Sequence, residues 1–213
     1  MANIIVFGDS IAHGYWDLHG GWVARLRKDL DKQNTKANCD EQYSLYNLSI
    51  PGDNSSNILD RFNHEIKRRV WGDKLTLIFA FGINDSVYIR KQKKHRVGQR
   101  QFKENLQKII KLARKYTLKI YFVGLTPVNQ KLVDPMLWSP NESYIEKDVE
   151  KYEQTLKEFC QENELQFIEL MKAFKKQDYE KLLFDGVHPN SKGHELIYEI
   201  IYKHLAKQSI LNL

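Results

Sequence analysis

Ser10, Asp185 and His188 are three residues whose types and spacing could support nucleophilic catalysis. Ser10 follows Gly8 and Asp9 near the start of the chain, and Asp185 and His188 lie three positions apart near its end. A serine hydroxyl is a weak nucleophile unless a base takes its proton, commonly an imidazole that a carboxylate orients. The sequence therefore contains a nucleophile, a base and an orienting acid for acyl transfer.

Three strand-like runs, of which the first and third are apolar enough to be buried, end just before residues able to act on a substrate. The runs span residues 3–7, 43–50 and 75–81. They precede Ser10, Gly52 and Asn84, respectively. Ligands of open α/β sheets bind beyond the carboxyl ends of the strands, so we expect these three residues to share one crevice. Backbone amides and an asparagine side chain there could stabilise the charge of a tetrahedral intermediate.

Each segment also has an ordinary structural explanation. Gly, Asp and Ser are common turn residues after a strand, and Asn84 could be part of such a turn. The segment around His188 could simply lead into a helix capped by Asn190 or Ser191. The order Ser, Asp, His is that of α/β-hydrolases, although the Gly-x-Ser-x-Gly elbow is absent. The occurrence of all segments in one order favours catalysis. Asp9 and Asp85 are expected to fasten the turns rather than to act as acids.

Four ordered blocks carry a resemblance to a known family. They are Gly8-Asp9-Ser10, Gly52 in Ile50-Pro51-Gly52-Asp53, Gly82-Ile83-Asn84-Asp85, and Asp185-Gly186-Val187-His188-Pro189. Together they resemble the SGNH (GDSL-type) esterases and lipases. The resemblance implies that Ser10 is the nucleophile, His188 the base and Asp185 its orienter. It also implies an oxyanion hole formed by the amides of Ser10 and Gly52 and the side chain of Asn84.

Residues 121–170 are similar to the bacterial branch of the same family, though more loosely. The departures from the family pattern are small. Residues 11–13 read Ile-Ala-His where a threonine is common, and Pro51 precedes the glycine. Neither departure removes a catalytic group, and His13 is expected in a loop or at the rim of the site.

Strand-like and helical segments alternate along the chain and predict a parallel α/β sheet. Further strands are expected at residues 118–124 and 165–170, and helices at 21–33, 55–71, 102–113, 144–162 and 191–206. We expect one domain over residues 1–213, with a five-stranded parallel sheet in a three-layer αβα arrangement. The resemblance implies the same flavodoxin-like fold.

The long connection 126–143 is predicted to form a pocket wall or lid, because such connections are uncommon in compact α/β domains. It carries Trp138, and Tyr15, Trp16 and Tyr88 are further candidates for substrate contact. The resemblance implies a small-molecule ester substrate, and a short-chain or acetyl ester is favoured because no strongly apolar flap is evident. A lysophospholipase, a thioesterase and a non-catalytic binding module on this fold are the alternatives.

The net charge of +6 and the basic segment 90–100 allow three interpretations. The segment could be a solvated loop, a nucleic-acid patch, or a border of the active site that attracts acidic substrates or lipid headgroups. No nucleic-acid motif is present, so nucleic acid is not an expected partner.

Neither a metal ion nor another cofactor is expected. No His-x-x-x-His pair, cysteine pair or phosphate loop occurs in the chain. The two cysteines, Cys39 and Cys160, lie far apart, and no signal peptide or membrane-spanning run is found. These features favour a cytoplasmic protein, with export of a processed form left open, and the oligomeric state is not predicted.

Overall fold

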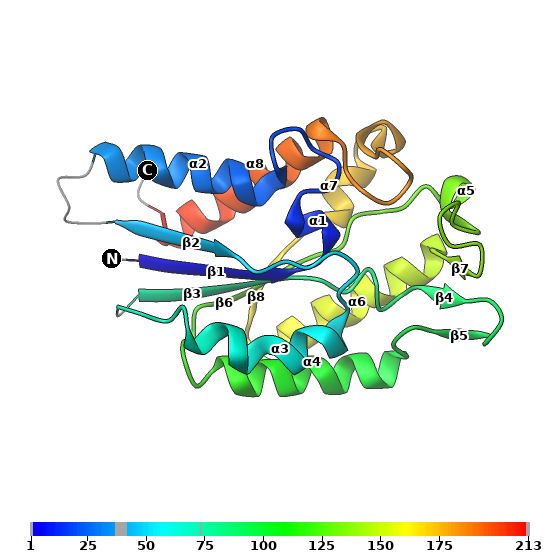
Figure 1. The fold of residues 1–213 in the computed structure, drawn as a ribbon, viewed down its shortest axis with the longest axis horizontal. Coiled ribbons are helices and arrows are strands. Elements are labelled where there is room, and N and C mark those ends of the chain that lie inside the picture. The colour runs from blue at the N-terminus through cyan, green and yellow to red at the C-terminus, as the bar shows by residue number, and fades with distance from the viewer. Residues whose placement is uncertain (1, 37–41, 73, 212–213) are drawn as a thin grey trace.

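A five-stranded parallel sheet forms the centre of the molecule (Figure 1). The computed structural model describes residues 2–36, 42–72 and 74–211, so Cys39 lies outside the described residues. The strands are β1 (Ala2–Gly8), β2 (Tyr43–Asn47), β3 (Lys74–Ala80), β6 (Ile120–Val123) and β8 (Gln166–Ile168). Their order in the sheet is β2-β1-β3-β6-β8, and every pairing is parallel. The predicted five-stranded parallel sheet is confirmed.

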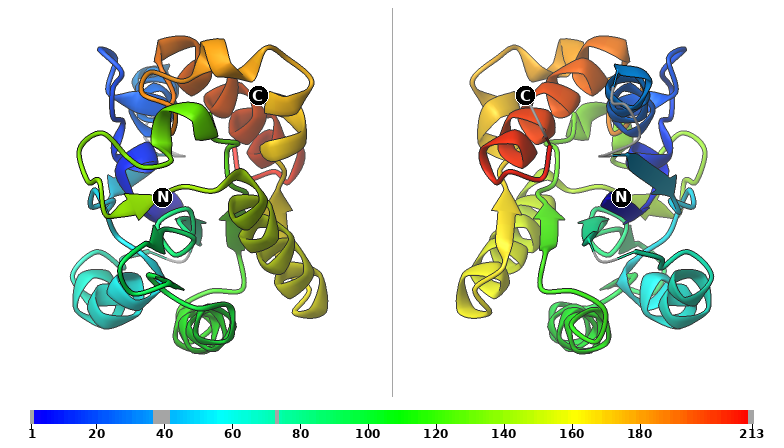
Figure 2. Two further views of the ribbon diagram at one scale, coloured as in Figure 1. Left: turned by 90° about the vertical axis from the view of Figure 1, so that its right-hand side faces the viewer. Right: turned by 90° about the vertical axis from the view of Figure 1, so that its left-hand side faces the viewer.

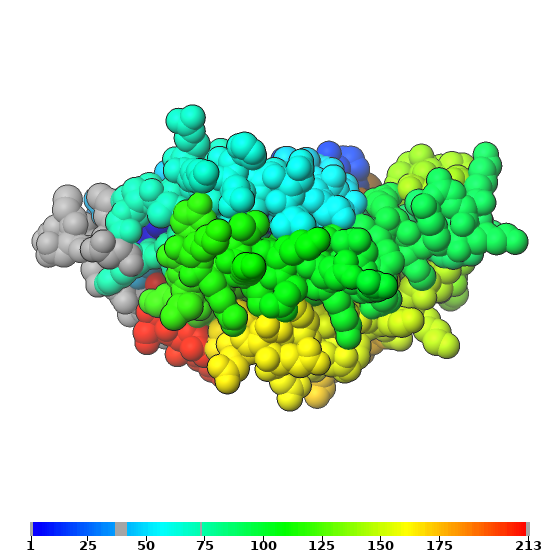
Figure 3. All heavy atoms as spheres, turned by 90° about the horizontal axis from the view of Figure 1, so that it is seen from below, coloured from blue at the N-terminus to red at the C-terminus, as the bar shows by residue number. Residues whose placement is uncertain are grey.

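Helices cover both faces of this sheet and give three layers (Figure 2). They include α2 (Gly21–Lys36) and α8 (Ser191–Lys207) on one face, and α3 (Ser55–Lys67), α4 (Gln99–Ala113) and α6 (Glu146–Glu162) on the other. Figure 3, seen from below Figure 1, shows the second set side by side over the sheet. The predicted three-layer αβα arrangement is confirmed.

Alternation along the strands explains the two apolar layers. In β1, Ile4 and Val6 pack in the cluster that contains α2 and α8, whereas Ile5 and Phe7 pack in the cluster that contains α3 and α4. Successive side chains of a strand point to opposite faces, so a fully apolar strand serves both layers. The Phe7 ring lies 5.8 Å from that of Phe79 in the neighbouring strand. The sheet thereby becomes a rigid platform for the loops at its carboxyl edge.

Short strands and a short helix lie in the segments that follow the sheet at its carboxyl edge. The basic segment forms a hairpin of β4 (Tyr88–Ile89) and β5 (Lys94–His95), and β4 also pairs with β7 (Glu142–Ser143). The connection 126–143 therefore contains a strand, together with the short helix α5 (Gln130–Val133). The sequence does not predict these strands, because strands of two residues leave no periodic pattern.

Three further short elements complete the fold, namely α1 (Ser10–His13), α7 (Met171–Lys175) and the 3-10 helix η1 (Tyr179–Leu182). Asn190, rather than Ser191, caps α8 and accepts hydrogen bonds from the amides of Lys192 and Gly193. Among the helices that the structure describes, none combines the length and apolar character needed to cross a membrane.

Candidate active site

Ser10, His188 and Asp185 form a hydrogen-bonded chain at the carboxyl edge of the sheet. Ser10 is the first residue of α1, directly after β1, and its Oγ lies 2.9 Å from Nε2 of His188. The other ring nitrogen of His188, Nδ1, lies 2.7 Å from Oδ2 of Asp185. With Nδ1–H donating to the carboxylate, Nε2 is free to accept the hydroxyl proton of Ser10.

The Asp185 carboxylate is held by four donors. Its Oδ1 accepts the backbone amides of Val187 and His188 at 3.1 and 2.9 Å, and its Oδ2 accepts His188 and the indole Nε1–H of Trp16 at 3.0 Å. Burial alone would raise the pKa of Asp185, but the hydrogen bonds and charge of His188 outweigh it and lower the pKa to about 2. The group is therefore a carboxylate at neutral pH.

The loop between η1 and α8 fixes the spacing of Asp185 and His188. Gly186, with a φ of 97°, lies so close to the connection 126–143 that a Cβ there would approach the Cβ of Leu132 to 2.8 Å. The Gly186 carbonyl accepts the amide of Asn129 at 2.8 Å. A glycine is required by both the backbone angle and the close approach.

Hydrogen bonds between strand ends bring Gly52 and Asn84 to the same edge as Ser10. The amide of Ile50 donates to Gly8 at 3.1 Å, and that of Asp9 donates to Ala80 at 3.3 Å. Gly52 has a φ of 86°, and apart from its chain neighbours no atom lies within 4 Å of where a Cβ would be. Its turn therefore borders open space, as access for a ligand requires.

The side-chain amide of Asn84 has a fixed orientation. Nδ2 donates to the carbonyl of Asp53 at 3.0 Å, and Oδ1 accepts the hydroxyl of the buried Tyr144 at 2.8 Å. Asp53 is itself paired with Arg61 at 2.7 Å. The second N–H of Asn84 has no hydrogen-bond partner among the described residues. Sequence analysis noted no role for Tyr144, because the contact joins residues 60 positions apart and follows no local pattern.

Replacing Tyr144 by phenylalanine is expected to lower kcat about tenfold while leaving the fold intact. The variant removes the donor that holds Asn84 Oδ1 and leaves the amide held only by its hydrogen bond to the Asp53 carbonyl, a loss of about one hydrogen bond. Steady-state kinetics on a soluble ester would measure it, with Tyr116→Phe on the far side of the molecule as control. An unchanged kcat in the Tyr144 variant would contradict the proposed orientation of Asn84.

Three of the four aromatic candidates for substrate contact surround His188, and one does not. The ring centroids of Tyr15, Trp16 and Trp138 lie 5.8, 6.2 and 6.3 Å from that of His188. Tyr88 instead belongs to the small sheet, where its ring meets His95 at 5.7 Å. Among the described contacts, none joins Tyr88 to Ser10, His188 or Asp185.

Other residues near the site hold the loops in place. His13 is exposed at the rim of the site, as expected, and its ring packs nearly perpendicular to that of Tyr15. The buried His194 has Nε2 2.8 Å from the Tyr15 carbonyl, to which it donates, and so fastens the loop that carries Trp16. Burial is also the main cause that lowers the pKa of His194.

Replacing Trp16 by phenylalanine is expected to lower kcat about tenfold with little change in KM. The exposed indole is a donor to Asp185, and its loss weakens the hold on the carboxylate that orients His188. Trp71→Phe is a matched control, because the Trp71 indole donates to Tyr46 away from the site. A rise in KM alone would show that Trp16 contacts substrate without positioning Asp185.

Asp9 and Asp85 are buried carboxyl groups that fasten the turns around Ser10. Asp9 Oδ1 accepts the amide of Ile11 at 3.0 Å, and Asp85 accepts the amide and hydroxyl of Ser55. Burial raises the pKa of both aspartates to about 7. Both contacts are the turn-fastening contacts expected from the sequence.

The raised pKa of Asp85 predicts a pH-dependent stability. Between about pH 4 and 7 the folded state keeps a proton that the unfolded state has released, so the free energy of unfolding falls as pH rises, by at most about 1.4 kcal/mol per pH unit for this group. Asp85→Asn imitates the protonated group and should flatten this slope in urea unfolding. Asp60→Asn, on an exposed position of α3, should not. Equal slopes for wild type and Asp85→Asn would refute the prediction.

Within the described ranges, no cluster of three or more His, Cys, Asp or Glu side chains is arranged to hold a metal ion. Cys160 is buried and forms no disulfide with another described residue. Burial raises the pKa of its thiol to about 12. It is therefore unsuited to act as a nucleophile.

The strand order is that of flavodoxin-like α/β proteins, and the hydrogen-bonded chain of Ser10, His188 and Asp185 lies at the carboxyl edge of the sheet. Residues 6–196 match the model of the GDSL-like lipase/acylhydrolase family. The chain belongs to that family, as the sequence resemblance implied. No curated protein sequence matches it significantly.

Solved structures show the same fold at low sequence identity. A lipase/acylhydrolase from Enterococcus faecalis superimposes with a TM-score of 0.74 at 23% identity, covering 98% of this chain and 97% of that one. A lipolytic protein of the G-D-S-L family from Veillonella parvula gives 0.71 at 20%, covering 97% and 100%. The acetyl xylan esterase AlAXEase gives 0.73 at 19%, covering 95% and 99%.

Proposed function

We propose that this protein is a serine esterase that hydrolyses carboxylic esters through an acyl-enzyme. The observation that carries the proposal is the continuous hydrogen-bonded chain from Ser10 Oγ through His188 to Asp185, at 2.9 and 2.7 Å. We also propose that residues 1–213 act as one domain, since a single sheet carries the site.

The chemistry proceeds in two steps. His188 Nε2 takes the Ser10 proton as Oγ attacks the ester carbonyl, and the imidazolium then protonates the departing alcohol. Water, deprotonated by the same nitrogen, attacks the acyl-enzyme and releases the acid and free Ser10. Asp185 stays ionised throughout, keeps Nδ1–H pointing toward itself and stabilises the imidazolium.

The negative oxygen of each tetrahedral intermediate is assigned to the amides of Ser10 and Gly52 and the Nδ2 of Asn84. Among the described residues, neither backbone amide donates a hydrogen bond, so both are available as donors to the substrate oxygen. Each such donor is commonly worth about 3 kcal/mol of transition-state stabilisation.

A short-chain or acetyl ester is the proposed substrate. Support comes from the aromatic surroundings of His188, formed by Tyr15, Trp16 and Trp138, and from the acetyl xylan esterase among the similar structures. Lysophospholipids and thioesters are the alternative substrates within the same chemistry.

Hydrolysis of p-nitrophenyl esters from acetate to palmitate tests the proposal. Release of p-nitrophenol with the highest kcat/KM for acetate or butyrate is the expected result. An optimum at long chains would replace the short-acyl assignment with a lipase. A folded protein that hydrolyses no ester and takes up no fluorophosphonate would be a binding module on this fold.

A further inference from the structure

Five large apolar side chains are exposed around the proposed catalytic residues. They are Trp16, Leu132, Leu137, Trp138 and Phe184, with exposed fractions from 47% to 84%, and we call them the apolar rim. Proteins usually bury such side chains, and their concentration at one site marks a surface that meets a partner.

The members of the apolar rim are neighbours in space although three loops supply them. The ring of Trp16 lies 6.1 Å from that of Phe184, and both Trp16 and Trp138 approach His188. Leu132 lies against Gly186, which directly follows Asp185 and precedes His188 by two positions. Four members of the rim thus lie around Asp185 and His188, and Leu137 directly precedes Trp138 in the chain.

The hairpin of β4 and β5 adds positive charge beside this rim. Residues 88–97 contain five lysines and arginines and no acidic residue. Two of the five anchor the hairpin to the segment that carries Leu137, because Arg90 pairs with Asp134 at 2.8 Å and Arg96 with Glu142 at 2.9 Å. The hairpin is thus tied to the segment 134–142, which carries Leu137 and Trp138 of the rim.

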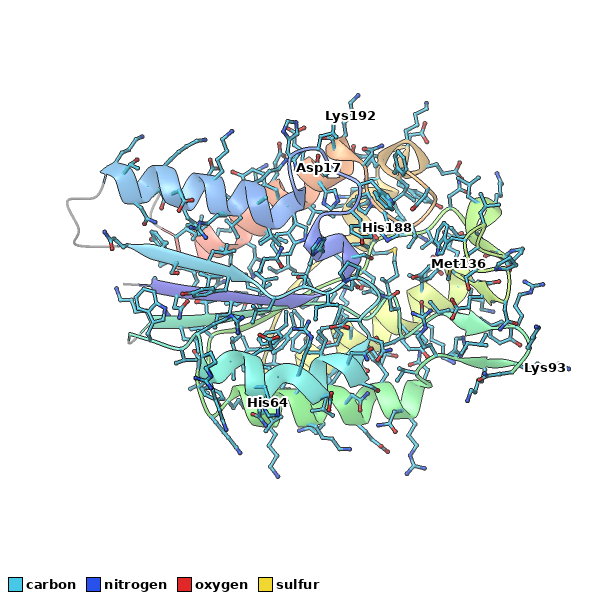
Figure 4. The ribbon with its side chains drawn as sticks, in the orientation of Figure 1. Asp17, His64, Lys93, Met136, His188 and Lys192 are labelled. Atoms are coloured by element: carbon cyan, nitrogen blue, oxygen red, sulfur yellow. The ribbon has the colours of Figure 1, made fainter. Side chains whose placement is uncertain are left out.

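The other three basic residues of the hairpin remain uncompensated. Lys91, Lys93 and Lys94 are exposed, and none takes part in an ion pair among the residues that the structure describes. Figure 4 shows Lys93 at the outer end of the hairpin, beyond Met136, with His188 nearer the middle of the molecule. Three free positive charges at the end of an anchored hairpin favour a partner with an anionic surface.

We infer that the apolar rim and the three lysines dock this protein on an anionic lipid bilayer. Tryptophan suits the interface of a membrane, leucine and phenylalanine insert among acyl chains, and each lysine near an anionic surface adds about 1 kcal/mol. Leu132 and Leu137, by contrast, have no ring that could stack on a sugar polymer. A second copy of the chain would bring like charges together.

Docking would bring Ser10 and His188 to the surface of the bilayer, and the short-chain esters proposed above would then be those of molecules held at that surface. This consequence for substrate choice rests on the proposed function, whereas the docking itself does not. Binding is therefore measured with the Ser10→Ala variant, which cannot consume the lipid, so failure of docking and failure of catalysis are separate results.

Co-flotation with vesicles of phosphatidylcholine alone, and with 30% phosphatidylglycerol, tests the inference. The expected result is binding to the anionic vesicles that high salt weakens. Changing Lys91, Lys93 and Lys94 to glutamine should weaken this binding roughly 100-fold. Leu137→Asp should weaken it at least about tenfold, since an apolar side chain no longer inserts.

Matched controls remove the same chemistry elsewhere. Lys103, Lys108 and Lys111 are exposed on α4, and Leu118 is 83% exposed before β6. Replacing these three lysines by glutamine, or Leu118 by aspartate, should leave vesicle binding unchanged. Thermal unfolding would verify that every variant is folded. Equal binding to neutral and anionic vesicles, equal losses in test and control variants, or binding to an insoluble polysaccharide without vesicle binding would overturn the inference.

Discussion

Ser10→Ala is expected to lower kcat/KM for ester hydrolysis by about 10⁶-fold, the scale of loss when a catalytic serine is removed. The substitution deletes only Oγ, whose described hydrogen bond is to His188. Ser10 is a buried first residue of α1, and alanine is well tolerated in a helix, so the free energy of unfolding should change little.

Kinetics on p-nitrophenyl acetate, with circular dichroism to verify the fold, would measure this loss. Ser44→Ala on β2 offers a matched control at a serine outside the site, and its activity should equal that of wild type. Retention of more than about a hundredth of the activity by folded Ser10→Ala would exclude the acyl-enzyme route, since no other group could replace the nucleophile so efficiently.

Asp185→Asn is expected to lower kcat by about 10⁴-fold. An asparagine amide directed at His188 Nδ1 donates a hydrogen bond where the carboxylate accepts one. The ring then carries its proton on Nε2, which faces Ser10 and can no longer accept the hydroxyl proton. In the wild type the low pKa of Asp185 keeps its carboxylate ionised, and this negative charge stabilises the imidazolium. The neutral asparagine does not supply that charge.

Asp178→Asn is the control for this prediction, since Asp178 lies on the preceding segment and pairs with the exposed Lys181. It should leave kcat unchanged. A loss of less than about tenfold in Asp185→Asn would mean that another group orients His188, and the assignment of Asp185 would fall.

The strands and long helices were predictable because each depends on a local pattern. Residues 4–7 are apolar without interruption, and the structure buries the corresponding strand on both faces. The helix predicted at 55–71 ends at Lys67, four residues early, and that predicted at 102–113 begins at Gln99. Helix ends depend on caps and neighbouring loops as well as on periodicity.

The contacts that arrange the site could not be predicted in the same way. Trp16 and Asp185 are 169 positions apart, and the hydrogen bond between them depends on how two loops meet. Tyr144 stands at the start of a helical pattern, where nothing in the sequence shows that its hydroxyl reaches Asn84. Tyr88 follows the third sequence block closely, yet its short strand directs it to His95. Such contacts are properties of the packed fold.

Covalent labelling tests the central claim, that Ser10 is an activated nucleophile, most directly. The protein would be treated with a fluorophosphonate, digested and analysed by mass spectrometry, beside Ser10→Ala. Our account predicts a single phosphonylated peptide that contains Ser10 in the wild type and no adduct in the variant. A folded wild type without an adduct, or an adduct that persists in Ser10→Ala, would contradict it.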